Sequence, residues 1–165
     1  MNEAPSDSPN RSHAFRAILW GGLLAGILDL SAAIVTNGFR GIVPIRILQS
    51  VASGLLGAES YKGGLRTALL GTALHFVITF TAAAIYYAVS RKLTFLVRGA
   101  VVSGLIYGIA IYWFMNLIVL PLSAVPFKIT FQPAIVVTGL IVHMLCVGLP
   151  IALAVRRFSN TNRPQ

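Results

Sequence analysis

Residues 15–36 read FRAILWGGLLAGILDLSAAIVT and contain two charged side chains, Arg16 near the start and Asp29. An α-helix rises about 1.5 Å per residue, so about 20 apolar residues cross the roughly 30 Å of hydrocarbon in a bilayer. This stretch has the necessary length and composition. It predicts a transmembrane helix.

Three more stretches share this composition, over residues 67–89, 99–120 and 133–155. Apolar residues make up 56% of the 165 positions and charged residues 10%, whereas soluble domains average about 45–50% and about 25%. The pattern predicts an all-α fold, an integral membrane four-helix bundle over residues 15–158. Pro121 is expected to end the third helix, because proline has no amide hydrogen.

The segment 42–57, between the first two spans, is too short and too polar to cross the membrane. On a helix its apolar residues fall on one face and its polar residues on the other. The apolar face holds Ile45, Leu48, Ala52 and Leu55, and the polar face holds Arg46, Gln49, Ser50 and Ser53. We expect an interfacial amphipathic helix. A re-entrant helix is the alternative, since nearby glycines would let the chain turn back.

Both ends of the chain are polar. Residues 1–14 are rich in Ser, Pro and Asn, so we expect a disordered cytoplasmic tail there, and a second tail over residues 159–165. With this orientation, the cytoplasmic side receives Arg11, Arg16, Arg91, Lys92, Arg98, Arg156, Arg157 and Arg163, and the outer side receives Arg40, Arg46, Lys62, Arg66 and Lys128. The cytoplasmic excess predicts that both termini are inside.

The net charge of +9 comes from these basic residues. They lie at the ends of apolar stretches and are not interleaved with exposed aromatic residues, as they would be in a protein that binds nucleic acid. The expected partner is therefore the lipid bilayer, and no nucleic acid.

Asp29 is the first candidate for a functional site. Placing a carboxylate in hydrocarbon costs at least about 2.5 kcal/mol, so Asp29 should face the protein interior with a partner or a proton. Gly22, Ala25 and Gly26 share its helical face and would let another helix approach. A proton or cation site and a hydrogen bond that only fixes packing are both open interpretations.

His75 and His143 are the other candidates, because equal rise per residue places them near the depth of Asp29. Asp29 and His75 could touch and share a proton. The two histidines could also ligate haem b from diagonal helices, with Gly71 and Gly139, four residues before them, making room. No other cofactor motif accompanies them, so no cofactor is expected, and a bis-histidine electron carrier is kept as an alternative.

Two glycine pairs suggest close helix crossing, within the chain or in a homo-oligomer. They are Gly22 with Gly26, and Gly104 with Gly108. They leave open a structural or assembly protein as a further alternative. Glu59 is expected to be a solvated charge, unless its connection folds over the bundle toward Asp29. Familiar catalytic and metal-binding motifs are absent from the sequence, so we expect neither an enzyme nor a metal site.

The strings GGLLAGILDLSAA (21–33), ILQSVASGLLGAESYKGG (47–64), ALLGTALHFVITF (68–80) and YWFMNLIVLPLSAVP (112–126) resemble a family of small bacterial inner-membrane proteins with four predicted spans and no established activity. The resemblance implies a bacterial inner-membrane protein in which the segment 42–57 belongs to the fold. With the interior candidates, the expected role is that of an accessory or transport-related protein with a polar site inside the membrane.

Overall fold

The computed structural model of the chain describes residues 9–159, and this part contains helices and no strand. Four of its helices are long and apolar enough to cross a membrane. They run over Ser12–Gly38, Gly64–Lys92, Ala100–Leu122 and Pro133–Ser159. The predicted spans overlap all four. The largest difference lies at the end of the last span, which is predicted at residue 155 and observed at Ser159. The chain therefore has the helices expected of a multi-pass membrane protein.

The first two spanning helices are continuous, and the last two are each built from three segments. The first two are α1 (Pro9–Gly38) and α3 (Gly64–Lys92). The third consists of α5 (Ala100–Phe114), the π-helical segment η2 (Met115–Val119) and α6 (Leu120–Leu122). The fourth consists of α7 (Pro133–Val142), the π-helical segment η3 (His143–Gly148) and α8 (Leu149–Ser159).

Three short elements connect them. The helix α2 (Pro44–Leu56) and the 3₁₀ segment η1 (Gly57–Lys62) lie between α1 and α3, and α4 (Phe95–Arg98) lies between α3 and α5.

The helix α1 begins earlier than expected. Residues 9–14, assigned to the tail, are helical, and Pro9 suits the first turn because its missing amide hydrogen is not needed there. The rest of the predicted N-terminal tail, and all but Ser159 of the C-terminal one, lie outside the described residues.

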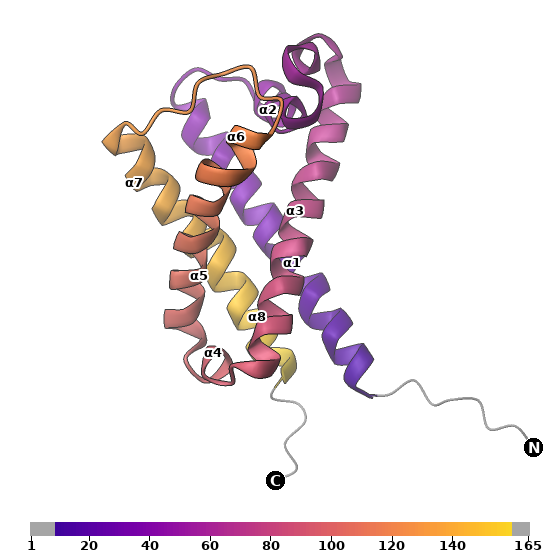
Figure 1. The fold of residues 1–165 in the computed structure, drawn as a ribbon. Coiled ribbons are helices and arrows are strands. Elements are labelled where there is room, and N and C mark those ends of the chain that lie inside the picture. The colour runs from indigo at the N-terminus through magenta and orange to yellow at the C-terminus, as the bar shows by residue number, and fades with distance from the viewer. Residues whose placement is uncertain (1–8, 160–165) are drawn as a thin grey trace, which may run out of the picture.

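The start of α1 and the end of α8 lie at one end of the molecule, together with α4 (Figure 1). The helix α2 and the connection between α6 and α7 lie at the opposite end (Figure 1). The helix α1 packs against α3 and α8, and α5 packs against η3 and α8. The molecule therefore has two different ends, one near the described chain ends and one formed by α2.

Small side chains form the core in the half near the chain ends. Ala17, Ala83 and Ala152 are completely buried there, from three different helices. Tyrosine hydroxyls join α3 to α5 in the same region, where Tyr107 donates to the carbonyl of Ala82 over 2.8 Å. Small residues let helices approach closely, and a buried hydroxyl needs such a partner. This half is tightly packed, and the cavity described below lies beyond it.

Large apolar side chains point outward along all four helices. Ile27, Val77, Ile106 and Ile141 are 48%, 60%, 60% and 50% exposed. Such a surface would be unusual in water, but lipid chains are as apolar as these side chains. The high hydropathy of the chain is therefore spread over its outer surface as well as its core.

Candidate functional site

A cavity of about 490 Å³ lies between α1, α3 and the last two spanning helices. Most of its lining is apolar, with Leu74, Ile78, Ile111 and Val147 among the side chains. Its polar lining includes Asp29, His75 and His143. The structure therefore brings the three residues that the sequence singles out into one cavity.

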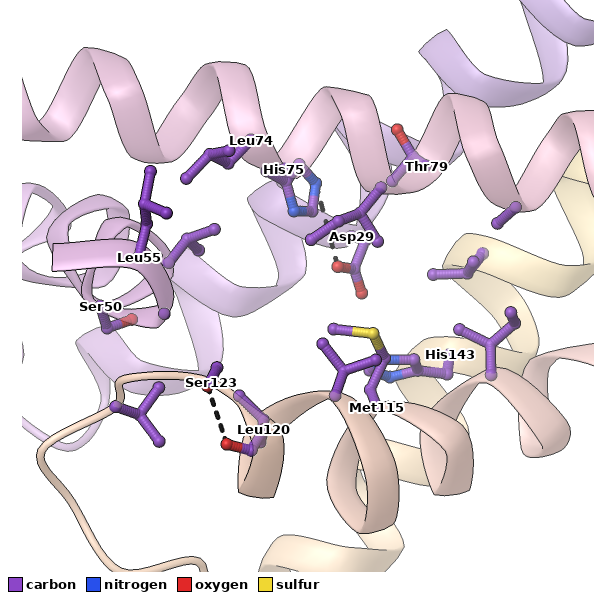
Figure 2. Close-up of a pocket in the computed structure, with 18 of the residues that line it drawn as sticks. Asp29, Ser50, Leu55, Leu74, His75, Thr79, Met115, Leu120, Ser123 and His143 are labelled. Atoms are coloured by element: carbon purple, nitrogen blue, oxygen red, sulfur yellow. Dashed lines mark hydrogen bonds and ion pairs between the residues drawn. The ribbon is translucent and has the colours of Figure 1, made fainter. Parts of the chain in front are cut away.

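Asp29 points into this cavity from α1, and His75 faces it from α3 (Figure 2). Oδ2 of Asp29 lies 4.0 Å from Nε2 of His75, and the side chains are 18% and 11% exposed. The contact expected from their matching depths is present. A charge on either side chain acts far more strongly on the other away from water than it would in water.

Gly26 allows α3 to come this close to Asp29. A Cβ at Gly26 would lie 2.7 Å from Cδ1 of Phe76 and 3.0 Å from Oγ1 of Thr79, so a larger residue would have to displace these side chains. Its carbonyl oxygen lies 3.0 Å from Nε2 of His75. A carbonyl only accepts, so Nε2 carries a hydrogen and donates it to Gly26. In the neutral ring, Nδ1 of His75 is then the nitrogen that can accept a proton.

His143 is held by its own helix. Its Nδ1 donates to the carbonyl of Gly139 over 2.9 Å, and the ring of Tyr112 lies edge-on to the imidazole with the centroids 5.3 Å apart. In the neutral ring Nε2 is then an acceptor. His143 therefore brings a second basic nitrogen to the residues that line the cavity.

Two spanning helices widen where they meet the cavity. Met115 begins η2 and His143 begins η3, and both residues line the cavity. The first amide after η2 donates to the carbonyl of Met115, and the first amide after η3 donates to that of Met144, in each case five residues earlier. Such single π-helical turns are rare and occur often at functional sites.

The same dipeptide, Leu–Pro, follows both π-helical segments, at residues 120–121 and 149–150. A proline ring collides with the carbonyl four residues earlier, and a wider turn removes this collision. The expectation that the third helix ends at Pro121 is therefore wrong. The helix accommodates Pro121 and continues to Leu122. The paired Leu–Pro motif was the sequence signal for these turns.

At the end of the molecule that carries α2, the cavity is covered by α2 itself and by the connection between α6 and α7. The amide of Ala124 donates to the carbonyl of Gly54 over 2.9 Å, which joins the two segments. Ser50, Ser123 and Phe127 line the cavity from this cover. The sequence left open that the segment containing α2 folds over the bundle. It did not indicate the part formed by the connection after α6, although the apolar Val125 and Phe127 are unusual in a connection that faces water.

The helix α2 turns part of its polar face toward the protein. Gln49 and Ser53 are buried, and Nε2 of Gln49 donates to the carbonyl of Gly64 over 3.1 Å. Leu55, from the apolar face, is 62% exposed. Gln49 can be buried because the first turn of α3 accepts its hydrogen bond, and Ser53 can be buried because its hydroxyl donates to the carbonyl of Ser50 within α2.

Glu59 does not reach the cavity. Its Oε1 lies 2.7 Å from Nζ of Lys62, and both side chains are more than two-thirds exposed, at 72% and 74%. The interpretation as a solvated charge is confirmed, and a cover that brings Glu59 to Asp29 is wrong.

A second cavity, of about 450 Å³, lies between α1 and α7. Asp29 and His143 line this cavity too, so they stand between the two. Its other polar residues are Thr36, Asn37, Arg40, Gln132 and Thr138. Arg40 follows the end of α1, and Gln132 precedes the start of α7. The second cavity therefore extends from the end of the molecule that carries α2 to Asp29, within α1.

The histidines do not fit axial haem ligation. Nε2 of His75 already donates to Gly26, and the carboxylate of Asp29 lies next to it. The glycines expected to make room are occupied as well, since Gly71 faces the backbone of Leu48 and Gly139 faces the ring of Tyr112. Among the described residues there is also no group of three His, Cys, Asp or Glu that could hold a metal ion.

The glycine pairs serve helix contacts within the chain. A Cβ at Gly22 would lie 2.9 Å from Cα of Phe80, and one at Gly104 would lie 3.0 Å from Cα of Leu149. Gly26 faces Phe76, and Gly108 faces the carbonyl of His143. These four positions are therefore not an open face for a second copy of the chain.

The chain matches no protein-family model, no curated protein and no solved structure in comparisons with all three.

Proposed function

We propose that this chain is a multi-pass protein of the bacterial inner membrane, with its four spanning helices in a bundle and both termini in the cytoplasm. The spatial distribution of charge supports this orientation. Arg91, Arg98 and Arg156 lie at the end where α8 stops, and fewer basic residues lie at the end that carries α2. In this orientation α2 lies at the periplasmic boundary, as an interfacial helix whose exposed Leu55 meets lipid.

Within this frame, we infer that the cavity binds a small, mostly apolar cation. One observation carries the proposal: Asp29, the one acidic residue in the four spanning helices, points into a cavity with largely apolar walls. An anion in such surroundings attracts a cation strongly, and the apolar walls suit a ligand with little capacity for hydrogen bonding.

His75 explains how the empty site would remain stable. A proton on Nδ1 of His75 would give the ring a positive charge that compensates the carboxylate of Asp29, 4.0 Å from Nε2, and a bound cation replaces that charge. Cation and proton thus compete for one acid. Of the residues that line the cavity, the titratable ones are Asp29, His75 and His143.

The second cavity extends this role toward transport. Because Asp29 and His143 border both cavities, a proton released on one side has a polar route past Thr138 toward Gln132 and Arg40. The resulting function is a transport-related or accessory role, based on binding and not on catalysis.

Binding of tetraphenylphosphonium tests the proposal, because this probe is an apolar cation without hydrogen-bond donors. The protein in lipid nanodiscs should bind it saturably in equilibrium dialysis. Asp29→Asn should weaken binding by about tenfold or more, which corresponds to about 1.4 kcal/mol. Glu59→Gln is the matched control, since it removes an acid that is exposed and distant from the cavity.

Equal binding by the wild type and Asp29→Asn would refute the proposal, as would the absence of saturable binding by the wild type. Uptake of the same probe into proteoliposomes then separates the two roles. Uptake that depends on Asp29 indicates a transporter, and binding without uptake indicates an accessory protein.

A further inference from the structure

A separate hollow of about 470 Å³ lies at the end of the molecule where α8 stops, and it shares no lining residue with the cavity around Asp29. It is formed by the last turn of α3, the short helix α4 and the last turn of α8, which meet at this end (Figure 1). Its polar lining consists of Ser90, Arg91, Thr94, Arg98, Arg156 and Ser159. Three arginines from three different elements thus line one hollow.

No carboxylate of the described residues balances these three charges. Of the acids in that part of the chain, Asp29 lies in mid-helix beside His75, and Glu59 pairs with Lys62 near α2. None of the three arginines forms an ion pair with a described residue. Like charges that converge without a counterion repel each other, so the hollow is suited to an anion.

Two general effects explain part of this charge. Basic residues collect on the cytoplasmic side, and they stabilise the last turn of a helix, where Arg91 and Arg156 lie. Arg98 lies in the last turn of α4 in the same way. Neither effect requires arginines from three separate elements to line the same hollow, which Arg157 does not line.

We propose that this hollow binds a phosphate group, carried by an anionic phospholipid or by a soluble phosphate. A guanidinium group can donate two parallel hydrogen bonds to phosphate oxygens, and the hydroxyls of Thr94 and Ser159 add donors. Basic hollows between spanning helices at the cytoplasmic boundary are suited to lipid headgroups. Leu93 and Phe95, on either side of Thr94, are 44% and 61% exposed and could contact acyl chains of the same lipid.

Native mass spectrometry of the full chain tests this, with phosphatidylglycerol and phosphatidylcholine supplied in equal amounts. The wild type should retain phosphatidylglycerol preferentially. Arg98→Gln and Arg156→Gln should each weaken that retention by about tenfold, as expected for a lost charge-assisted hydrogen bond. Arg157→Gln removes the same charge one residue away and should have little effect.

A titration with inorganic phosphate distinguishes the two sources. Phosphate that displaces the lipid, with the same dependence on Arg98 and Arg156, identifies soluble phosphate as a ligand. Retention of phosphatidylglycerol in excess phosphate identifies the lipid. Equal effects of all three substitutions would overturn the proposal, and so would the absence of both a preference for phosphatidylglycerol and any binding of phosphate. Thermal unfolding in detergent without added lipid checks that each variant is folded.

Discussion

The Nε2 atom of His75 lies 4.0 Å from Oδ2 of Asp29, yet its hydrogen goes to a backbone carbonyl, that of Gly26 at 3.0 Å. The orientation of the imidazole is therefore set by the backbone of α1 and does not depend on the charge of Asp29. Nδ1 can gain or lose a proton while the ring stays in place. This separates the structural role of His75 from its role beside the acid.

Substitutions at His75 should separate these two roles. In His75→Gln the amide nitrogen can still donate to Gly26, so thermal stability should stay near that of the wild type. In His75→Ala the hydrogen bond is lost, which should cost about 1 kcal/mol. Both variants lack the basic nitrogen, so both should bind tetraphenylphosphonium without the proton release of the wild type. Unfolding in detergent and pH measurements in weak buffer provide the two readouts.

Thr81→Ala is the control for stability, since it removes a hydroxyl that bonds within its own helix, to the carbonyl of Val77. A loss in His75→Gln as large as that in His75→Ala would show that packing, and not the hydrogen bond, holds the ring.

Glycine substitutions should reveal where the helices cross. A Cβ at Gly148 would lie 2.8 Å from Cα of Gly108 and would also overlap the carbonyl of Gly104, so Gly148→Ala must push two helices apart. We expect a loss of about 3 kcal/mol, at the upper end for overpacked cores. Gly38→Ala is the control, because nothing lies within 4 Å of its Cβ position. Equal melting temperatures of the two variants would contradict the observed crossing.

The spans and the depth of the polar residues could be predicted because both follow from local chemistry. A run of apolar residues determines a span, and equal rise per residue places Asp29 and His75 together. The partners of each side chain could not be predicted in this way. Nothing local indicates that His75 donates to Gly26, or that the polar Gln49 is buried against α3.

The part of the cover that follows α6 and the π-helical segments were missed for a related reason. The connection after α6 has no periodicity, and its position depends on a backbone hydrogen bond to Gly54, distant in sequence. A proline predicts a local disturbance of a helix, but Pro121 alone does not decide between ending the helix and widening it. That choice depends on the packing of the surrounding helices.

The second cavity should be reached from water at the end that carries α2. Thr138 lines this cavity, and Val137, the next residue, is 54% exposed without lining it. In a Cys146→Ala background, Thr138→Cys should react with an impermeant cationic thiosulfonate added outside whole cells. Val137→Cys lies at the same depth but should face lipid and stay unmodified. Equal labelling of both would argue against a polar route, and labelling of Thr138→Cys only after permeabilisation would reverse the proposed orientation.

The contact between α2 and the connection after α6 can be locked to test whether it controls entry to the first cavity. A Cβ at Gly54 would lie 3.7 Å from Cβ of Ser123. Disulfides join residues whose Cβ atoms are about 3.5 to 4.5 Å apart, so Gly54→Cys combined with Ser123→Cys should form one without moving the backbone. The native Cys146 is replaced by Ala in this variant, so that it cannot pair with either new thiol.

Because Gly54 and Ser123 both line the cavity, their cross-link would hold its cover closed. Oxidation should slow the binding of tetraphenylphosphonium at least about tenfold, and a reductant should restore it, if the ligand enters past this cover. Each single cysteine variant controls for the loss of Gly54 or Ser123 itself and should be insensitive to oxidant. Unchanged binding kinetics in a fully cross-linked sample would place the entrance elsewhere, between the spanning helices, and would leave the contact with Ala124 a purely structural one.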